Sequence, residues 1–253
     1  MAVIGIFDSG SGGLSVLKEL RELIPQARYI YYSDNANCPY GDKAPEFILQ
    51  RGRFITGLLL DKGADIIVVA CNTATAAAIS ALRKEYPVPF VGMEPAVKPA
   101  ALQTKTGVIG VLATAGTLKG SLYLDTKSKF EDDVRIIEHV GRGFVELVEG
   151  CELSGPHAED VVRTSLQPLL DAGADRIVLG CTHYPFLMPL MEKMVPSAVQ
   201  FINPAPAVAR QTLHILQEKG VITMGDTAAG SVELISSGNP APLEHLFRNI
   251  NTT

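Results

Sequence analysis

The sequence contains little positive charge and does not concentrate it anywhere. Its 22 lysine and arginine residues are outnumbered by 27 aspartate and glutamate residues, which gives a formal net charge of -5. Proteins that bind nucleic acid usually carry a basic patch or stripe. This charge pattern therefore disfavours nucleic-acid recognition.

Signals for a membrane are also missing. The N-terminus, MAVIGIFDSG, has no basic segment and reaches Asp8 almost at once, so it resembles neither a signal peptide nor an anchor. The most apolar window, residues 66–82, is interrupted by Asn72, Thr73 and Thr75, which excludes a membrane-spanning helix there. We expect a cytoplasmic protein without membrane contact.

Cysteines are few, and none stands in a CxxC pair. A reducing cytosol would keep all of them as thiols. They are Cys38, Cys71, Cys151 and Cys181.

What is present is a repeated alternation of short apolar runs and segments of helical period, which is typical of parallel strands joined by crossover helices. The predicted fold class is α/β. Helices are expected after the first strand, in GLSVLKELRELI, and in PEFILQRGRFITGLLLDKG. The predicted strands are 2–8, 28–33, 65–70, 88–93, 107–112, 133–138, 175–180 and 199–202.

Two segments of the chain repeat each other. AVIGI at residues 2–6 corresponds to GVIGV at 107–111, and GAD at 63 corresponds to GAD at 173. Similar offsets predict two pseudo-symmetric α/β lobes, each with a mainly parallel sheet, and an active site in the cleft between them. We expect the first lobe to comprise residues 1–96 and about 208–253, and the second lobe residues 97–207, with EPAVKPA as the junction.

Each lobe delivers a cysteine to the end of a strand. Cys71 follows DIIVVA and Cys181 follows DRIVLG. Ligands of open parallel sheets bind at the carboxyl ends of the strands. Because a segment able to start a helix follows each cysteine, we expect the helix field to lower the thiol pKa.

Several chemistries use thiols, and they differ in how many they need. A Cys-His hydrolase would pair Cys181 with His183 and leave Cys71 unused. A redox pair lacks its CxxC context, and a zinc site needs more than the two ligands of Cys-x-His, so no metal is expected. A racemase without cofactor uses both thiols equally, since one removes a proton from a planar intermediate and the other supplies one from the opposite side.

The surrounding residues favour a small amino acid as ligand. DSGSGG, residues 8–13, lacks the third glycine of a dinucleotide fingerprint, and Asp8 would repel a pyrophosphate but suit an ammonium group. No lysine motif marks pyridoxal phosphate attachment. His183 can exchange protons near neutral pH. Hydroxyl and amide groups suited to carboxylates lie on Ser9, Asn72, Thr73 and Thr182, and a turn-rich loop carries Tyr40 and Gly41.

Taken together, these motifs resemble those of glutamate racemases, in the cofactor-independent aspartate/glutamate racemase superfamily. The resemblance extends over essentially the whole chain. The matching segments are FDSGSGGLSVL from Phe7, YYSDNANCPYG from Tyr31, VACNTAT from Val69, VGMEPAVKPA from Val91, FVELVE from Phe144 and LGCTHYP from Leu179.

The resemblance implies interconversion of L- and D-glutamate, with D-glutamate supplied for peptidoglycan, by two lobes that close over the ligand, often in a homodimer. Cys71 would be the base towards D-glutamate and Cys181 the base towards L-glutamate. Asp8 would assist the first thiol and His183 the second, with Glu149 as an acidic residue near the second thiol. Substrate contacts would come from Asp8, Ser9, Tyr40, Gly41, Asn72, Thr73, Thr182 and His183.

The chain departs from the family pattern at GRGF, residues 141–144, where a Cys-Pro-Phe segment is expected before FVELVE. The position of Glu149 is therefore left for the structure to decide. The chain also begins at its first strand, without the extension of members that need a cell-wall precursor as activator, and we expect no such activation. The alternatives are an aspartate or hydantoin racemase, a non-catalytic amino-acid-binding protein, and a Cys-His hydrolase.

Overall fold

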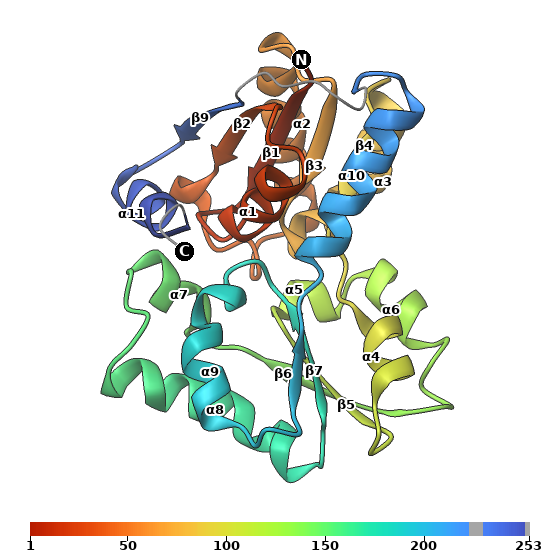
Figure 1. Cartoon of the computed structure of the whole chain (residues 1–253), viewed down its shortest axis with the longest axis vertical. Coiled ribbons are helices and arrows are strands. Elements are labelled where there is room, and N and C mark those ends of the chain that lie inside the picture. The colour runs from red at the N-terminus through yellow and green to blue at the C-terminus, as the bar shows by residue number, and fades with distance from the viewer. Residues whose placement is uncertain (223–229, 251–253) are drawn as a thin grey trace.

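The computed structural model describes residues 1–222 and 230–250. Within them, two parallel sheets form the centres of two lobes, one above the other in Figure 1. The predicted α/β class is therefore correct.

The first sheet has the strand order β4-β3-β1-β2-β9, and every neighbouring pair is parallel. Its last strand comes from the C-terminal part of the chain and lies at the edge, beside β2 (Figure 1). The strands are β1 (Val3–Asp8), β2 (Arg28–Ser33), β3 (Ile66–Val69), β4 (Phe90–Gly92) and β9 (Ser231–Ser236).

The second sheet repeats this order as β8-β7-β5-β6, again with parallel pairs only. In this correspondence β5 takes the place of β1 and β7 takes the place of β3, as the repeated sequence motifs predict. The strands are β5 (Val108–Ala113), β6 (Arg135–Val140), β7 (Arg176–Gly180) and β8 (Gln200–Ile202).

Every strand segment predicted from the sequence forms a strand, and its ends shift by at most two residues. The strand β9 was not predicted. Its sequence, SVELIS, has a polar residue at both ends and none of its residues is fully buried, so it lacks the apolar run that identifies a central parallel strand.

Helices cover both faces of each sheet. Around the first sheet, α2 and α3 pack together on one side, whereas α1 packs against α10 and α11 on the other. These helices are α1 (Leu14–Leu23), α2 (Pro45–Asp61), α3 (Asn72–Glu85), α10 (Ala205–Glu218) and α11 (Ala241–Ile250).

Around the second sheet, α4 packs on β5 and β7, while α8 packs on β5 and β6. The helix α4 begins within EPAVKPA, the segment predicted as the junction. The helices of this lobe are α4 (Val97–Gln103), α5 (Ala115–Leu118), α6 (Ser121–Lys127), α7 (Phe144–Glu149), α8 (Pro156–Asp171) and α9 (Met188–Met194). Short 3-10 helices are η1 (Asn35–Asn37) in the first lobe and η2 (Tyr184–Leu187) in the second.

The strands are apolar on both faces because helices bury both. In β3, Ile66 and Val68 belong to the core beside α1, whereas Ile67 and Val69 belong to the core beside α2 and α3. The core beside α1 also includes Leu179 of β7. One apolar cluster therefore extends from the first lobe into the second.

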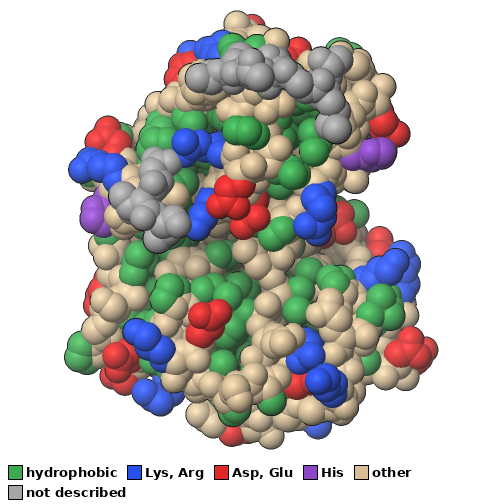
Figure 2. All heavy atoms as spheres, in the orientation of Figure 1, with side chains coloured by type: hydrophobic (Ala, Val, Ile, Leu, Met, Phe, Trp, Pro, Cys, Tyr) green, Lys and Arg blue, Asp and Glu red, His purple; other side chains and the backbone are tan. Residues whose placement is uncertain are grey.

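The outer surface shows acidic and basic side chains interspersed over the visible face of the described chain (Figure 2). Among the described residues, no helix is both long and apolar enough to cross a membrane.

Candidate active site

Three site residues stand where buried strands end. Asp8 is the last residue of β1, Cys71 follows β3, and Cys181 directly follows β7. Since β3 and β7 occupy equivalent positions in the two sheets, the cysteines are equivalent too. They are 5% and 7% exposed, so protein atoms cover both thiols.

Cys71 is the N-cap of α3. Its sulfur accepts a hydrogen bond from the Ala74 backbone N–H at 3.4 Å, and its thiol donates to Ser9 Oγ at 3.8 Å. Burial and the nearby Asp8 raise the pKa of Cys71 to about 12, although the bond from Ala74 opposes this. The expectation that the helix field would lower this pKa is therefore wrong, because desolvation and a neighbouring carboxylate outweigh a single helix end.

Asp8 joins the two lobes. Its side chain is fully buried, and it accepts hydrogen bonds from Ser9 Oγ at 3.0 Å and from the Gly10 N–H at 3.1 Å on its own lobe. On the second lobe, Thr182 Oγ1 donates to Asp8 Oδ2 at 2.7 Å. A continuous chain of contacts thus runs from Cys71 through Ser9 and Asp8 to Thr182, the residue next to Cys181.

The carboxyl group of Asp8 is held away from water. Burial raises the pKa of Asp8 above its ordinary value, and the nearby His183 and the hydrogen bonds to Asp8 offset only part of this effect. A buried carboxylate of this kind is stabilised by a cation.

Cys181 has a different set of neighbours. Its sulfur lies 3.7 Å from His183 Nδ1, and His183 Nε2 lies 2.7 Å from Glu149 Oε1. Burial alone would lower the pKa of His183, but its hydrogen bonds to thiols and to Glu149 raise that pKa well above the ordinary value. These contacts therefore favour the protonated form of His183 beside Cys181.

Glu149 ends α7 and also reaches the first lobe. It accepts a hydrogen bond from the Ser11 N–H at 2.6 Å and another from Ser11 Oγ at 3.1 Å. Burial raises the pKa of Glu149, but His183 and Ser11 outweigh that effect and hold the pKa below its ordinary value. GRGF does not displace this residue, because Gly143 starts α7 with a positive φ of 83° and the helix then carries Glu149 to the cleft.

The glycines of DSGSGG make room for these second-lobe side chains. A Cβ atom on Gly12 would lie 2.3 Å from His183 Nδ1, and one on Gly10 would lie 2.2 Å from Glu149 Oε1. Both contacts are far shorter than van der Waals distance. The glycines therefore allow the His183-Glu149 pair to approach the first strand end.

Polar groups line the next part of the cleft. Within the described residues, the buried side chain of Asn72 has a hydrogen-bond partner for neither its oxygen nor its nitrogen. Thr73 Oγ1 lies 2.8 Å from Thr114 Oγ1 and 3.3 Å from Thr117 Oγ1. An unpartnered amide and a group of hydroxyls suit a bound polar ligand.

Thr114, Thr117 and Ser11 were not identified from the sequence. VIGIFDS and VIGVLAT are equivalent segments of the repeat, so Thr114 stands at the position of Ser9, and this correspondence could have identified it. Neither Thr117 nor Ser11 shows a comparable signal, since each is recognised only by what it contacts across the cleft.

The predicted loop residues Tyr40 and Gly41 lie at the border of the cleft. The Tyr40 hydroxyl donates to Asp34, whose carboxylate also accepts two hydrogen bonds from Arg51, at 2.8 and 2.9 Å. A Cβ atom on Gly41 would lie 3.3 Å from Thr114. Gly41 therefore faces the second lobe, whereas the hydroxyl of Tyr40 already has a partner in its own lobe.

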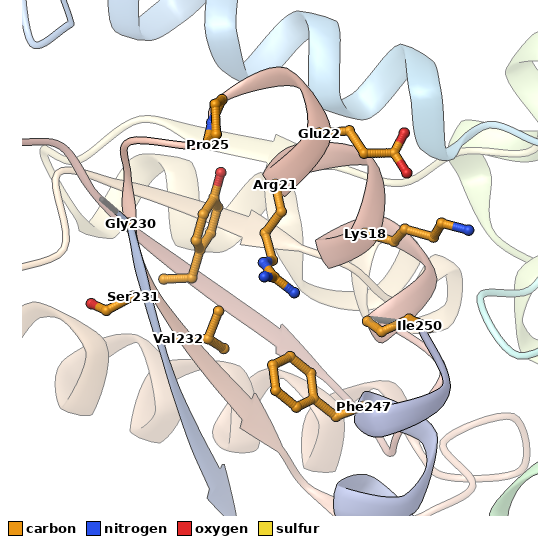
Figure 3. Close-up of a pocket in the computed structure, with 10 residues that line it drawn as sticks. Lys18, Arg21, Glu22, Pro25, Gly230, Ser231, Val232, Phe247 and Ile250 are labelled. Carbon is orange, nitrogen blue, oxygen red and sulfur yellow. The ribbon is translucent and has the colours of Figure 1, made fainter. Parts of the chain in front are cut away.

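Several pockets of the described chain lie outside this buried centre. One of about 510 Å³ opens beside the threonines, between the lobes, and its lining includes Gly41, Thr73 and Gly116. Another pocket of about 620 Å³ lies between α1, β9 and α11 (Figure 3). There the guanidinium carbon of Arg21 lies 5.7 Å from the centre of the Phe247 ring. The second pocket shares no residue with the site around the cysteines.

Comparison with known proteins agrees with this geometry. Residues 5–212 match the family model described as Asp/Glu/Hydantoin racemase. The chain is 46% identical over 238 residues to a glutamate racemase of Herpetosiphon aurantiacus, covering 94% of this chain and 93% of that protein.

Solved structures give the same result. A glutamate racemase of Bacillus anthracis matches with a TM-score of 0.89 and 30% identity, covering 100% of this chain and 94% of that one. The Escherichia coli glutamate racemase, in complex with L-glutamate and the activator UDP-MurNAc-Ala, matches with a TM-score of 0.86 and 32% identity, covering 98% and 95%. The chain belongs to the Asp/Glu/hydantoin racemase family, in which it is an amino-acid racemase of the glutamate racemase group.

Proposed function

We propose that this racemase interconverts L- and D-glutamate by a two-base mechanism in which Cys71 and Cys181 act on opposite sides of the α-carbon. The observation that carries the proposal is the hydrogen-bonded connection between the two cysteine-bearing strand ends, through Ser9, Asp8 and Thr182. It holds two equivalent thiols, one from each lobe, at a single buried centre.

The proposed chemistry needs no cofactor. The thiolate of one cysteine removes the α-proton, so that the C–H bond breaks, an S–H bond forms, and the electron pair is delocalised into the carboxylate. The thiol of the other cysteine then gives its proton to the opposite face of the planar intermediate. In the direction that forms D-glutamate, Cys181 would be the base that removes the α-proton of L-glutamate, and Cys71 would protonate the opposite face. In the reverse direction, Cys71 would be the base towards D-glutamate.

Neighbouring groups support the two protonation states that this mechanism needs. Without substrate, the raised pKa keeps Cys71 as a thiol. The ammonium group of an amino acid placed beside Asp8 would pair with its buried carboxylate and favour ionisation of Cys71. On the other side, His183 can exchange a proton with Cys181, 3.7 Å away.

The polar lining supports an amino dicarboxylic acid as substrate. Asn72 has unused hydrogen-bonding groups, and Thr73, Thr114 and Thr117 form a cluster of hydroxyls that can donate to a carboxylate. Thr182 and Ser9 flank Asp8. We propose that these groups bind the two carboxylates, with Gly41 at the border and Tyr40 holding the loop through Asp34.

The proposed biological role is supply of D-glutamate for peptidoglycan. The cytoplasmic location and the homodimer stay predictions. An aspartate or hydantoin racemase is the main alternative. Because one methylene changes binding by only about 1–3 kcal/mol, the turnover of glutamate, aspartate and hydantoins must be measured side by side to decide between them.

The test is hydrogen exchange in deuterated water, starting from each enantiomer. A two-base enzyme forms product that carries deuterium while the remaining substrate is still unlabelled early in the reaction. We expect Cys71→Ala and Cys181→Ala each to lower kcat/KM for racemisation by about 10³-fold or more, with Cys151→Ser as the matched control at a partly buried cysteine that the proposed mechanism does not use.

Three results would contradict the proposal. Ordinary racemisation by either alanine variant would show that two thiols are not needed. Tight glutamate binding in calorimetry with no exchange of the α-hydrogen would identify a binding protein. A trapped acyl-enzyme on Cys181, insensitive to Cys71→Ala, would instead identify a hydrolase.

A further inference from the structure

A third thiol stands beside the Cys181 half of the site. Cys38 lies on the loop between β2 and α2, and the proposed mechanism gives it no task. Among the described residues, the ligand atoms of Cys38, Glu149 and His183 all lie within 4.8 Å of one another. These three residues are called the Cys38 cluster below.

The cluster lies where the loop after β2 meets the end of helix α7, which follows β6. Cys38 follows β2, and Glu149 follows β6, which takes the place of β2 in the second sheet. A Cβ atom on Gly10 would lie 2.2 Å from Glu149 Oε1 and 3.0 Å from Cys38 Sγ. The absence of a side chain at Gly10 therefore leaves the space in which the sulfur and the carboxylate approach each other.

We propose that the Cys38 cluster binds a zinc-like divalent cation and that this cation holds the racemase in an inactive, closed state. Thiolate, imidazole and carboxylate are the ligands that zinc prefers, and three protein ligands leave a fourth position for water. Mg²⁺ and Ca²⁺ require oxygen ligands and would not be retained. When the cation binds, the Cys38 S–H proton and the proton on the ligating nitrogen of the His183 ring are both released to solvent, and a metal–sulfur and a metal–nitrogen bond replace the S–H and N–H bonds.

The sequence argument for a metal considered only Cys181 and His183, which is too few ligands. The fold supplies the missing ones, because Cys38 and Glu149 are more than a hundred residues apart in the chain and meet only across the cleft. Cys38 and Glu149 are partly buried and His183 is fully buried, so the ligand set has one side towards solvent.

Two consequences for activity follow, and they rest on the proposed function. First, the cation would replace the hydrogen bond between His183 and Glu149, so that His183 could no longer supply a proton to Cys181. Second, Cys38 belongs to the first lobe and the other two ligands to the second, so a bound cation would link the lobes. Both thiols of the centre are covered, and a substrate needs the lobes to separate in order to enter.

The experiment uses the full chain, kept reduced without thiols, and has a readout that does not depend on activity. Co²⁺ is titrated as a spectroscopic substitute for Zn²⁺, and the ultraviolet charge-transfer absorption of a cobalt–thiolate bond is recorded. We expect this band in the wild type and in Cys151→Ser, and we expect it to be lost in Cys38→Ser and Cys38→Ala. Two substitutions are used so that a fold defect in one does not decide the result, and thermal unfolding checks both.

Activity is then measured with Zn²⁺ in the same proteins. We expect the wild type and Cys151→Ser to be inhibited, a chelator to restore their activity, and Mg²⁺ to have no effect. In both Cys38 variants the Zn²⁺ concentration for half inhibition, measured relative to each variant's own activity without metal, should rise by at least about tenfold. Zn²⁺ should raise the unfolding temperature of the wild type, since a ligand of the folded state stabilises it.

The outcomes separate this proposal from the proposed function. A cobalt–thiolate band and zinc inhibition that persist in both Cys38 variants would overturn it, since a thiol other than Cys38 would then be the ligand. No cobalt–thiolate band in the wild type would overturn it as well. A band that depends on Cys38 in a protein without racemase activity would support the metal site while removing the proposed function.

Discussion

Cys71 and Cys181 occupy equivalent positions in two sheets of the same strand order, yet their surroundings are chemically opposite. Cys71 lies beside a buried carboxylate, Asp8, and its pKa is raised to about 12. Cys181 lies beside the buried imidazole of His183, and the contacts of this ring with the thiols and Glu149 raise its pKa and favour its charged form. The repeated fold fixes the positions of the two thiols. The charged neighbours, Asp8 beside Cys71 and His183 beside Cys181, give the two thiols different electrostatic surroundings.

This difference has a functional meaning for a racemase. The two enantiomers have equal free energies, and in the proposed two-base mechanism each half of the site serves as acid in one direction and as base in the other. Identical surroundings would give two thiols of the same ionisation state. An anionic neighbour on one side and a cationic neighbour on the other favour one thiol and one thiolate, which is the arrangement that a single proton removal requires.

The most severe test of this difference removes the charged side chain beside each cysteine in turn. We expect Asp8→Asn and His183→Asn each to lower kcat/KM by about 10²–10⁴-fold, the range of a lost acid-base group. Because the equilibrium lies midway between the enantiomers, the loss must be the same in both directions, as circular dichroism can measure. His214→Asn, at an exposed histidine, is the control and should keep full activity. If only one of the two site variants loses activity, the halves do not act as a pair.

The next prediction concerns the space that the first lobe leaves for the second. In Gly12→Ala the new Cβ would lie 2.3 Å from His183 Nδ1, so the imidazole has to move. A displacement of this size at a reacting group costs about 10²-fold in activity. Gly57→Ala, within α2, is the matched control because a Cβ there meets nothing within 4 Å, and it should stabilise the fold by about 0.5–1 kcal/mol. Full activity in Gly12→Ala would show that His183 needs no fixed position.

The geometry around these glycines marks the limit of what the sequence could predict. The strands, the repeat and the two cysteines follow from local patterns, namely apolar runs that end in small polar residues, and the structure agrees with them. The contacts of Glu149 with Ser11 and His183 join parts of the chain far apart in sequence, so no local pattern encodes their distances. From the sequence, the glycines in DSGSGG are compared only with a dinucleotide fingerprint, whereas the structure shows that their lack of side chains admits His183 and Glu149.

The prediction of a lowered pKa for Cys71 is wrong for a related reason. A helix start next to a cysteine can be read from the sequence, and its field does favour the thiolate. Burial and the distance to Asp8 cannot be read in this way, and in the folded protein they have the larger effect. Similarly, β9 escaped prediction because an edge strand needs only one neighbour and no continuous apolar run.

Glu149→Gln tests how the imidazolium is maintained. The variant keeps the shape of the side chain but removes the negative charge next to His183, so the pKa of His183 should fall and could be followed by NMR. We expect a loss of activity of about tenfold, corresponding to about 1.5 kcal/mol for a hydrogen bond between charged groups.

The same variant has a pH signature. The raised pKa of His183 stabilises the fold fully below its unfolded value, 6.5, and this stabilisation is lost as the pH rises through the folded pKa. The lowered pKa of Glu149 stabilises the fold above its unfolded value, 4.5, and that contribution is lost as the pH falls through the folded pKa. The wild type should therefore exceed Glu149→Gln in unfolding free energy most between these two values. Denaturant unfolding across the pH range measures this, and a difference that is constant with pH would contradict the ion pair.

The smallest predicted effect concerns two positions that the repeat makes equivalent, Ser9 beside Cys71 and Thr114 in the hydroxyl cluster. Thr114 Oγ1 lies 2.8 Å from Thr73 Oγ1 and 2.9 Å from Thr117 Oγ1. Thr114→Val keeps the shape and removes the hydroxyl, so we expect KM for glutamate to rise about twofold to tenfold, for about 0.5–1.5 kcal/mol, with kcat nearly unchanged. Thr114→Ser keeps the hydroxyl and should stay close to the wild type. If Thr114→Ser raises KM as much as Thr114→Val, packing rather than hydrogen bonding explains the role of Thr114. Ser9 and Thr114 would then be equivalent in position but not in the function of their hydroxyl groups.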